Sequence, residues 1–242
     1  MKAVQSRRNL AVLVVSLLFG VVPAVQAAEK APAKSVAAKS AVAESAAAES
    51  AATESDVQRM TDLQVKMMPF GAIFDMLAKA DPKWPMQEKP DAVTPVQLGC
   101  LRGELSTPGY RRYKQAQVEA YLVANPSRAS SEIALLEQGA AELFGKLILA
   151  GADTERSGVQ ADPEALLKNA TPEQMSSFMS FFGDPNHAEL RKLSGLGDAI
   201  SPGKSASENE SAGEQLGSTI TLQVMLKAMS TCEVPTSVLF EE

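Results

Sequence analysis

The stretch from Asn125 to Gly151 constrains the fold more than any other part of this sequence, because it has the pattern of one long amphipathic helix. Asn125 is a suitable N-cap, Pro126 fits the first helical position, and Gly151 is the expected end. Such a helix would extend roughly 37 Å at 1.5 Å per residue, and its apolar face needs several neighbouring helices to cover it. We therefore expect it to be the spine of a helical bundle. The apolar face is formed mainly by Ile133, Leu136, Ala140, Leu143 and Leu147.

Pairs of a capping residue and a proline recur along the chain and indicate where helices begin. In each pair a Thr, Asn or Asp side chain can cap the first turn, and the proline suits the first helical position, where no amide hydrogen is needed. No sustained alternation of apolar and polar residues suggests a strand, and Pro69 is expected to break an earlier helix near Met67. The sequence predicts an all-α bundle of about seven or eight short to medium helices. The six pairs are Thr94-Pro95, Thr107-Pro108, Asn125-Pro126, Asp162-Pro163, Thr171-Pro172 and Asp184-Pro185.

The N-terminal residues have the pattern of a secretory signal peptide. A basic start containing Arg7 and Arg8 precedes a short apolar run over residues 10–22, and small residues lead to a cleavage site before Ala28. No later segment approaches 18 consecutive apolar residues, so no membrane-spanning segment is expected. We predict that residues 1–27 are a cleaved signal peptide and that the mature chain is periplasmic.

Residues 28–55 are rich in alanine and repeat a Lys-Ser or Glu-Ser pair every five residues. A period of five matches neither a helix nor a strand, so we predict a flexible, disordered spacer with no face to bury. The helical domain is expected to span residues 56–242. Its first helix should begin near Ser55, which has the spacing of a capping box with Gln58, and residues 196–215 are expected to form a polar loop.

Charge and residue counts exclude several classes of function. The chain has 23 Lys and Arg against 29 Asp and Glu, and removal of the predicted signal peptide takes away three basic residues and no acidic ones, so the formal charge moves from −6 to −9. An acidic chain is poorly suited to nucleic acid, whose phosphates require basic surface. With one histidine in the whole sequence, we expect neither a metal site nor haem, and no other cofactor is predicted.

Cys100 and Cys232 are the only cysteines in the sequence. An even number of cysteines in an exported chain indicates a disulfide, because the compartments outside the cytoplasm are oxidising. We predict that the two are bonded to each other, which would tie the beginning of the bundle to its end. Two free, buried thiols are the alternative.

One basic cluster, at residues 110–114, stands in the otherwise acidic domain. It falls in the opening turns of the helix expected after Pro108, where free backbone amides and guanidinium groups together favour an anion, and the two tyrosines could contact a lipid head group. The alternative is a solvated face in which either arginine pairs with Glu104 or Glu119. The candidate anion-binding residues are Tyr110, Arg111, Arg112, Tyr113 and Lys114.

Trp84 and the ten methionines each allow more than one interpretation. Trp84 stands between two prolines in a loop, and it either presents its ring to a ligand or fixes the loop to the bundle. Two methionine pairs have i, i+4 spacing, which suits core packing, Cu(I) binding through thioethers, or a groove for apolar segments of exported proteins or lipids. The pairs are Met175/Met179 and Met225/Met229.

Residues 171–190 contain two of the expected helix starts and carry a recognisable motif. On these residues the chain resembles a family of bacterial periplasmic helical proteins, domain of unknown function 2059. The resemblance implies a helical protein of the export compartment and brings no catalytic residues. His187 and Glu189 stand where the motif has glycine and lysine. The matching residues are Thr171, Glu173, Gln174, Met175, Phe181, Phe182, Asp184, Pro185 and Leu190.

These observations favour a non-catalytic, exported protein that binds a ligand or maintains the cell envelope through an apolar or anion-binding surface. Its partner would be an envelope protein, a peptide or an anionic amphiphile. The alternative is a periplasmic hydrolase that uses carboxylate or serine chemistry. A nucleophilic enzyme is disfavoured because His187 is the only histidine and the sequence contains no G-x-S-x-G motif.

Overall fold

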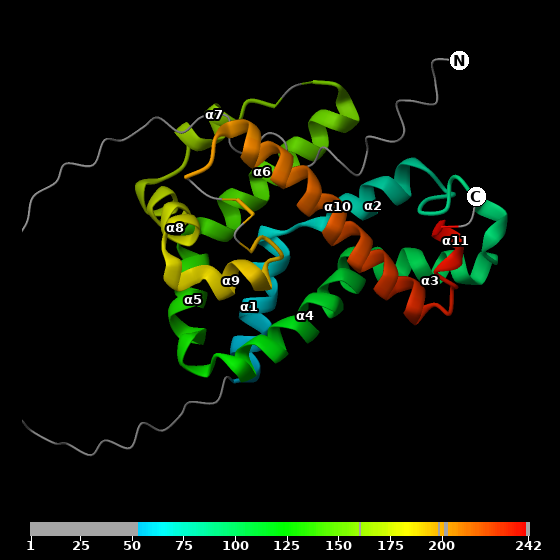
Figure 1. Ribbon diagram of the computed structural model, residues 1–242, viewed down its shortest axis with the longest axis horizontal. Coiled ribbons are helices and arrows are strands. Elements are labelled where there is room, and N and C mark those ends of the chain that lie inside the picture. The colour runs from blue at the N-terminus through cyan, green and yellow to red at the C-terminus, as the bar shows by residue number, and fades with distance from the viewer. Residues whose placement is uncertain (1–52, 160, 198, 201–202, 241–242) are drawn as a thin grey trace, which may run out of the picture.

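The computed structural model describes residues 53–159, 161–197, 199–200 and 203–240. The predicted signal peptide and nearly all of the predicted spacer lie outside the described residues. Within the described ranges every regular element is helical, and eight of the α-helices there have seven residues or more. The all-α prediction is therefore confirmed (Figure 1).

The elements follow one another along the chain with short connections. The first half contains α1 (Glu54–Met67), α2 (Phe70–Ala80), the 3-10 turn η1 (Pro90–Ala92), α3 (Pro95–Leu105), α4 (Thr107–Ala124), the 3-10 turn η2 (Pro126–Arg128) and α5 (Ala129–Leu135). The second half contains the π-helical turn η3 (Leu136–Ala140), α6 (Ala141–Ser157), α7 (Pro163–Lys168), α8 (Pro172–Gly183), the 3-10 turn η4 (Pro185–His187), α9 (Ala188–Leu193), α10 (Ala206–Thr231) and α11 (Ser237–Phe240).

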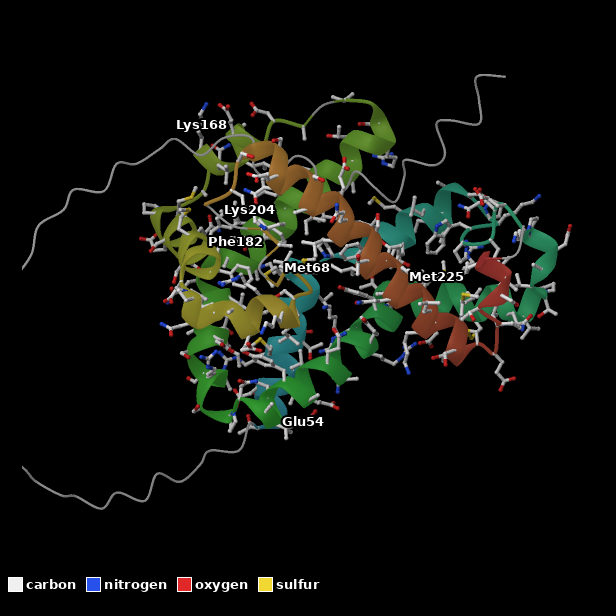
Figure 2. The ribbon with its side chains drawn as sticks, viewed as in Figure 1. Glu54, Met68, Lys168, Phe182, Lys204 and Met225 are labelled. Atoms are coloured by element: carbon white, nitrogen blue, oxygen red, sulfur yellow. A yellow bond between two sulfur atoms is a disulfide. The ribbon has the colours of Figure 1, made fainter. Side chains whose placement is uncertain are left out.

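Helix α1 is surrounded by other helices, because α4, α5 and α6 all pack against it. The helix is interrupted between α1 and α2 at Met68-Pro69, as the position of Pro69 predicts. Helix α2 then packs on α3 and α4. Met68 is only 1% exposed and lies near the centre of the molecule (Figure 2). Helix α10 runs diagonally across the molecule and packs against α3 (Figure 1).

Helix α1 begins slightly earlier than the sequence predicts. Thr53 caps it and forms a capping box with Asp56, whereas the expected box was Ser55 with Gln58. The hydroxyl of Thr53 accepts a hydrogen bond from the Asp56 amide, and the Asp56 carboxylate accepts one from the Thr53 amide. Gln58 is used differently, since its amide donates to Glu54 on the same helix.

Most of the predicted pairs of a capping residue and a proline do start helices. The side chains that cap the next turn as predicted are those of Thr94, Asp162, Thr171 and Asp184. Helix α4 begins one residue earlier than expected, because Ser106 rather than Thr107 is its cap. Asn125 makes no capping bond, and its side chain donates to the carbonyl of Tyr121 instead.

The single long helix predicted over residues 125–151 is wrong. The segment is divided by η3, where Gly139 has a positive φ of 127°. Only glycine adopts this conformation without strain, and a Cβ on Gly139 would lie 2.4 Å from Cγ of Gln174 on α8. Beyond η3 the helix does not stop at Gly151 but continues to Ser157, where Gly158 ends it with φ 70°.

The polar loop predicted over residues 196–215 is also too long. Helix α10 already begins at Ala206, where Ser205 and Glu208 form a capping box. The polar residues that suggested a loop belong to the first turns of this helix, and one of them, Asn209, is only 2% exposed. A capping box outweighs a polar composition as evidence for a helix start.

A disulfide joins Cys100 on α3 to Cys232 at the end of α10, with 5.7 Å between their Cα atoms. The predicted pairing is confirmed, and the alternative of two free thiols is wrong. The bond cross-links the two helices at the point where α10 meets α3. Gln97 supports the same junction, because its side chain donates to the carbonyl of Glu233 over 3.0 Å.

Trp84 fixes its loop to the bundle. Its side chain is 8% exposed, and its ring centroid lies 5.6 Å from that of Phe74 on α2, so it is not presented to a ligand. Of the methionine pairs, Met229 is fully buried and Met225 packs against the core, whereas Met179 is 45% exposed. None of the described helices combines the length and the apolar character needed to cross a membrane.

Candidate functional site

The predicted anion-binding residues do not share one surface, because a helix turns about 100° per residue. Arg111 forms an ion pair of 2.8 Å with Asp62 on α1, and Arg112 forms one of 2.7 Å with Glu104 on α3. Each guanidinium group is therefore neutralised by a different neighbouring helix. The pairing of Arg112 with Glu104 is the one that the alternative interpretation anticipated.

Two other members of the cluster point into the protein. Tyr110 is fully buried and Lys114 is 3% exposed, and the four-residue spacing places both on the same side of α4. Gln117 and Tyr121 continue this line at seven and eleven residues from Tyr110. We call these four residues, Tyr110, Lys114, Gln117 and Tyr121, the polar face of α4.

Lys114 is a buried cation whose contact is a carbonyl group. Its Nζ donates to the carbonyl oxygen of Leu193, the last residue of α9, over 3.2 Å. The final carbonyls of a helix lack partners within the helix and carry partial negative charge, so this contact is favourable. Burial lowers the pKa of Lys114 to about 8, because the ammonium group is removed from water.

Several buried polar atoms on α4 and on the neighbouring helix α1 neither donate nor accept a hydrogen bond within the described protein. They are the hydroxyl of Tyr110, Oε1 of Gln117, and both the oxygen and the nitrogen of the Gln64 side chain. Gln64 is fully buried on α1, the helix that packs against α4. Asp62, two residues before Gln64 on α1, forms the ion pair with Arg111 on α4.

The other end of the polar face is fully hydrogen-bonded. The hydroxyl of Tyr121 donates to Oε2 of Glu132 over 2.7 Å, and Glu132 on α5 is only 2% exposed. Nη1 of Arg128 lies 3.8 Å from Oε1 of Glu132 and donates to the carbonyl of Asn186 in η4. Burial raises the pKa of Glu132, and the hydrogen bond from Tyr121 opposes this rise.

His187 lies beside this end, in η4. Its Nε2 is 4.0 Å from Asp184, and its Nδ1 is buried and has no hydrogen-bond partner among the described residues. Burial lowers its pKa, while the Asp184 carboxylate acts in the opposite direction. Arg191, on the following helix α9, is buried and donates to the carbonyls of Phe181 and Asp184. Among the described residues, no group of three or more His, Cys, Asp or Glu could hold a metal ion.

Sequence reasoning missed Gln64, Tyr121 and Glu132. A signal for Tyr121 was present, since Tyr110, Lys114, Gln117 and Tyr121 recur at helical spacing, but the basic cluster was interpreted as consecutive residues rather than as one side of a helix. No comparable pattern identifies Gln64 or Glu132, because each is a single amide or carboxyl group on a helix face whose other buried residues are mainly apolar. Their importance depends on which helix packs against them.

Residues 171–190, for which the sequence predicts a family resemblance, form α8, η4 and the start of α9. The matching residues build the structure: Thr171 and Gln174 make a capping box, and Phe181, Phe182 and Leu190 are buried. Ser177 joins this segment to η3, since its hydroxyl accepts a hydrogen bond from the Ala140 amide. The motif residues therefore account for a packed helix pair and not for a chemical site.

Comparisons of the chain with protein-family models, with curated proteins and with solved structures found no match. Any statement about function therefore depends on the geometry of the polar face and its neighbours.

Proposed function

We propose that this chain is an exported, non-catalytic binding protein whose ligand contacts the polar face of α4. The observation that supports it most directly is Gln64, whose fully buried amide has no hydrogen-bond partner in the described protein at either its oxygen or its nitrogen. Buried polar groups are nearly always hydrogen-bonded, and one left unsatisfied costs about 1–3 kcal/mol. A bound polar molecule that offers both an acceptor and a donor would remove this cost.

The disulfide and the predicted signal peptide support export to the periplasm. Structural disulfides persist in oxidising compartments and are rare in the cytosol. Fractionation of cells that express the full chain should place the protein in the periplasm, with Ala28 as its first residue, and deletion of residues 1–27 should leave it in the cytoplasm. Recovery of the intact chain from the cytoplasmic fraction would contradict this part of the proposal.

The arrangement of His187 supports a binding role over nucleophilic catalysis. A serine or cysteine nucleophile needs a base within hydrogen-bonding distance. In the part of the chain that the structure describes, no serine, threonine or cysteine side chain hydrogen-bonds to His187, and both cysteines are in the disulfide. The partner would be a small polar molecule, an envelope peptide or protein, or an anionic amphiphile.

Native mass spectrometry can test the binding function. Protein purified from the periplasm should carry additional mass that disappears after unfolding and refolding, and the loss should lower the melting temperature. Gln64→Met should abolish the additional mass, whereas Gln58→Met, an exposed glutamine on the same helix, should retain it. Identical masses before and after refolding would contradict the proposal.

A hydrolase is the second candidate, and Glu132 is the observation that favours it. A buried carboxyl group with a raised pKa retains its proton more readily and can act as a general acid. This candidate ranks lower because Glu132 is only 2% exposed and its Oε2 is already bound by Tyr121. Turnover of any ester, amide or glycoside that Glu132→Gln abolishes would support the hydrolase over the binding protein.

A further inference from the structure

Lys114 differs from four lysines for which the structure shows ion pairs. Lys66, Lys146, Lys168 and Lys192 each form an ion pair with a glutamate. Lys114 is more deeply buried than any of them, yet no carboxylate in the described part of the chain lies within ion-pair distance of its ammonium group. A buried charge without a counter-charge is strongly unfavourable, and proteins normally pair such groups.

The groups along α4 next to Lys114 are suited to hydrogen bonding with a guest. The ammonium group has three N–H donors, of which the contact with Leu193 uses one. Tyr110 lies one turn before it, and its hydroxyl is free to donate. Gln117 lies one turn after it and offers a free carbonyl oxygen as an acceptor. Gln64, on the neighbouring helix α1, adds an amide nitrogen and an amide oxygen that have no partner among the described residues.

This set of groups defines the chemistry of a matching ligand. An oxyanion would accept hydrogen bonds from Lys114 and Tyr110, and its negative charge would balance the ammonium group. The free amide oxygens repel a bare anion but accept a hydrogen bond from a hydroxyl on the same ligand. Because Lys114 and Gln64 are buried, the ligand must also be compact.

We infer that the polar face of α4 binds a compact oxyanion that also carries a hydroxyl group, with its charge held by the ammonium of Lys114. The inference rests on the proposed binding function and makes it specific. It differs from the surface site predicted at Arg111 and Arg112, whose charges are already balanced by Asp62 and Glu104. Inorganic phosphate and lactate have the required chemistry, whereas acetate has the charge without the hydroxyl.

Thermal unfolding and titration calorimetry of the full mature chain, freed of any co-purified ligand by refolding, test the inference. Phosphate or lactate should raise the melting temperature in a saturable way, as RT ln(1 + [L]/Kd) requires, and acetate should raise it less. Lys114→Met should weaken binding at least about tenfold, the change expected for loss of a charge-assisted hydrogen bond. Lys146→Met, an exposed lysine paired with Glu142, is the matched control and should bind like the parent chain.

Two further measurements distinguish failure of this inference from failure of the proposed binding function. Lys114→Gln retains a donor for Leu193 without the charge, so it should fold like the parent chain and still lose affinity for phosphate. An equal rise in melting temperature in the parent chain and in both Lys114 variants would reflect the general stabilisation by excluded salts and would overturn the inference. Native mass spectrometry that finds an uncharged ligand on the parent chain and on Lys114→Met would uphold the binding function and overturn only the anion.

Discussion

The junction of α3 with α10 buries apolar side chains, whereas the polar face of α4 buries polar ones. At the junction, Leu101 and Met229 are fully buried, and the disulfide holds the two helices together. Along α4, the buried groups include a lysine without a carboxylate partner and a tyrosine whose hydroxyl is unpaired. Selection for stability alone would favour only the arrangement at the junction of α3 with α10.

The difference between the two regions indicates how the protein tolerates an unfavourable interior. Buried polar groups without partners lower stability, and natural proteins retain them mainly where function requires it. A cross-link and a well-packed apolar junction elsewhere in the same bundle can offset that loss. If this division is correct, changes at the junction should destabilise the protein, whereas apolar replacements on the polar face should stabilise it.

Loss of the disulfide should have the largest effect. The bond closes a loop with a sequence separation of 132 residues, which corresponds to about 5 kcal/mol of stabilisation in the chain-entropy model. Replacing Cys100 and Cys232 by serine should lower the free energy of unfolding by about this amount, measured by urea denaturation. A loss below about 1 kcal/mol would show that the junction does not supply the stability that the comparison requires.

Lys114→Met should act in the opposite direction. The pKa of Lys114 falls from 10.5 to about 8 on folding, so burial of its charge costs the parent chain about 3 kcal/mol of stability. The variant avoids this cost but loses the hydrogen bond to Leu193, which lowers its stability by about 1 kcal/mol. The ligand-free variant should therefore be about 2 kcal/mol more stable than the parent chain at pH 7 in urea denaturation. Destabilisation would mean that the contact with Leu193 outweighs the burial of the charge.

The pH dependence of this gain has a definite sign. Because the folded pKa of Lys114 lies below the unfolded value, the unfolded chain binds more protons between pH 8 and 10.5. Stability of the parent chain should rise through this window relative to Lys114→Met, and the advantage of the variant should shrink. The tyrosines, whose pKa values burial raises, are the same in both chains, so their ionisation cancels when the two chains are compared at pH 7.5 and 9.5.

Gln64→Met should stabilise the ligand-free protein by about 1–2 kcal/mol, because it removes an unsatisfied buried amide and leaves a side chain of similar volume. The control Gln58→Met should change stability by less than about 0.5 kcal/mol, since Gln58 is exposed. A destabilised Gln64→Met would show that the amide has partners in solution, such as ordered water, that methionine cannot replace.

Glu132→Gln should have the smallest effect at neutral pH, within about 1 kcal/mol, because the amide oxygen can still accept from Tyr121. The folded pKa of Glu132 is raised, so its contribution to stability is present at low pH and is lost as pH rises through the folded pKa. The parent chain should therefore gain stability relative to the variant as the pH falls from neutral through the folded pKa toward the unfolded value of 4.5. A constant difference in unfolding free energy across this range would contradict the assigned shift.

The sequence was sufficient for features that depend on local chemistry. The capping box of Thr171 and Gln174, the break at Pro69 and the pairing of Cys100 with Cys232 all follow from residue type and position. The break at Gly139 could not be recognised in this way. The apolar residues keep helical spacing on both sides of it, and its positive φ is fixed by contact with Gln174, which lies in a different helix.

The candidate site was harder to predict than the fold. The sequence identifies Lys114 and Tyr110, but only as members of a surface cluster with Arg111 and Arg112, because these residues are close together in the sequence. Only the packing of α1 and α9 against α4 shows that two of the four turn inward. Gln64 joins them through tertiary packing alone.

The position of the disulfide also affects the order of events during synthesis. A chain is made from its N-terminus, so Cys100 appears 132 residues before Cys232. At about 5–20 residues per second, Cys100 is therefore made about 7–26 s before its partner. Since the sequence contains only these two cysteines, no wrong pairing within one chain exists. The one incorrect disulfide that these cysteines can form is a bond between two molecules, and its frequency should rise with the concentration of unoxidised chains.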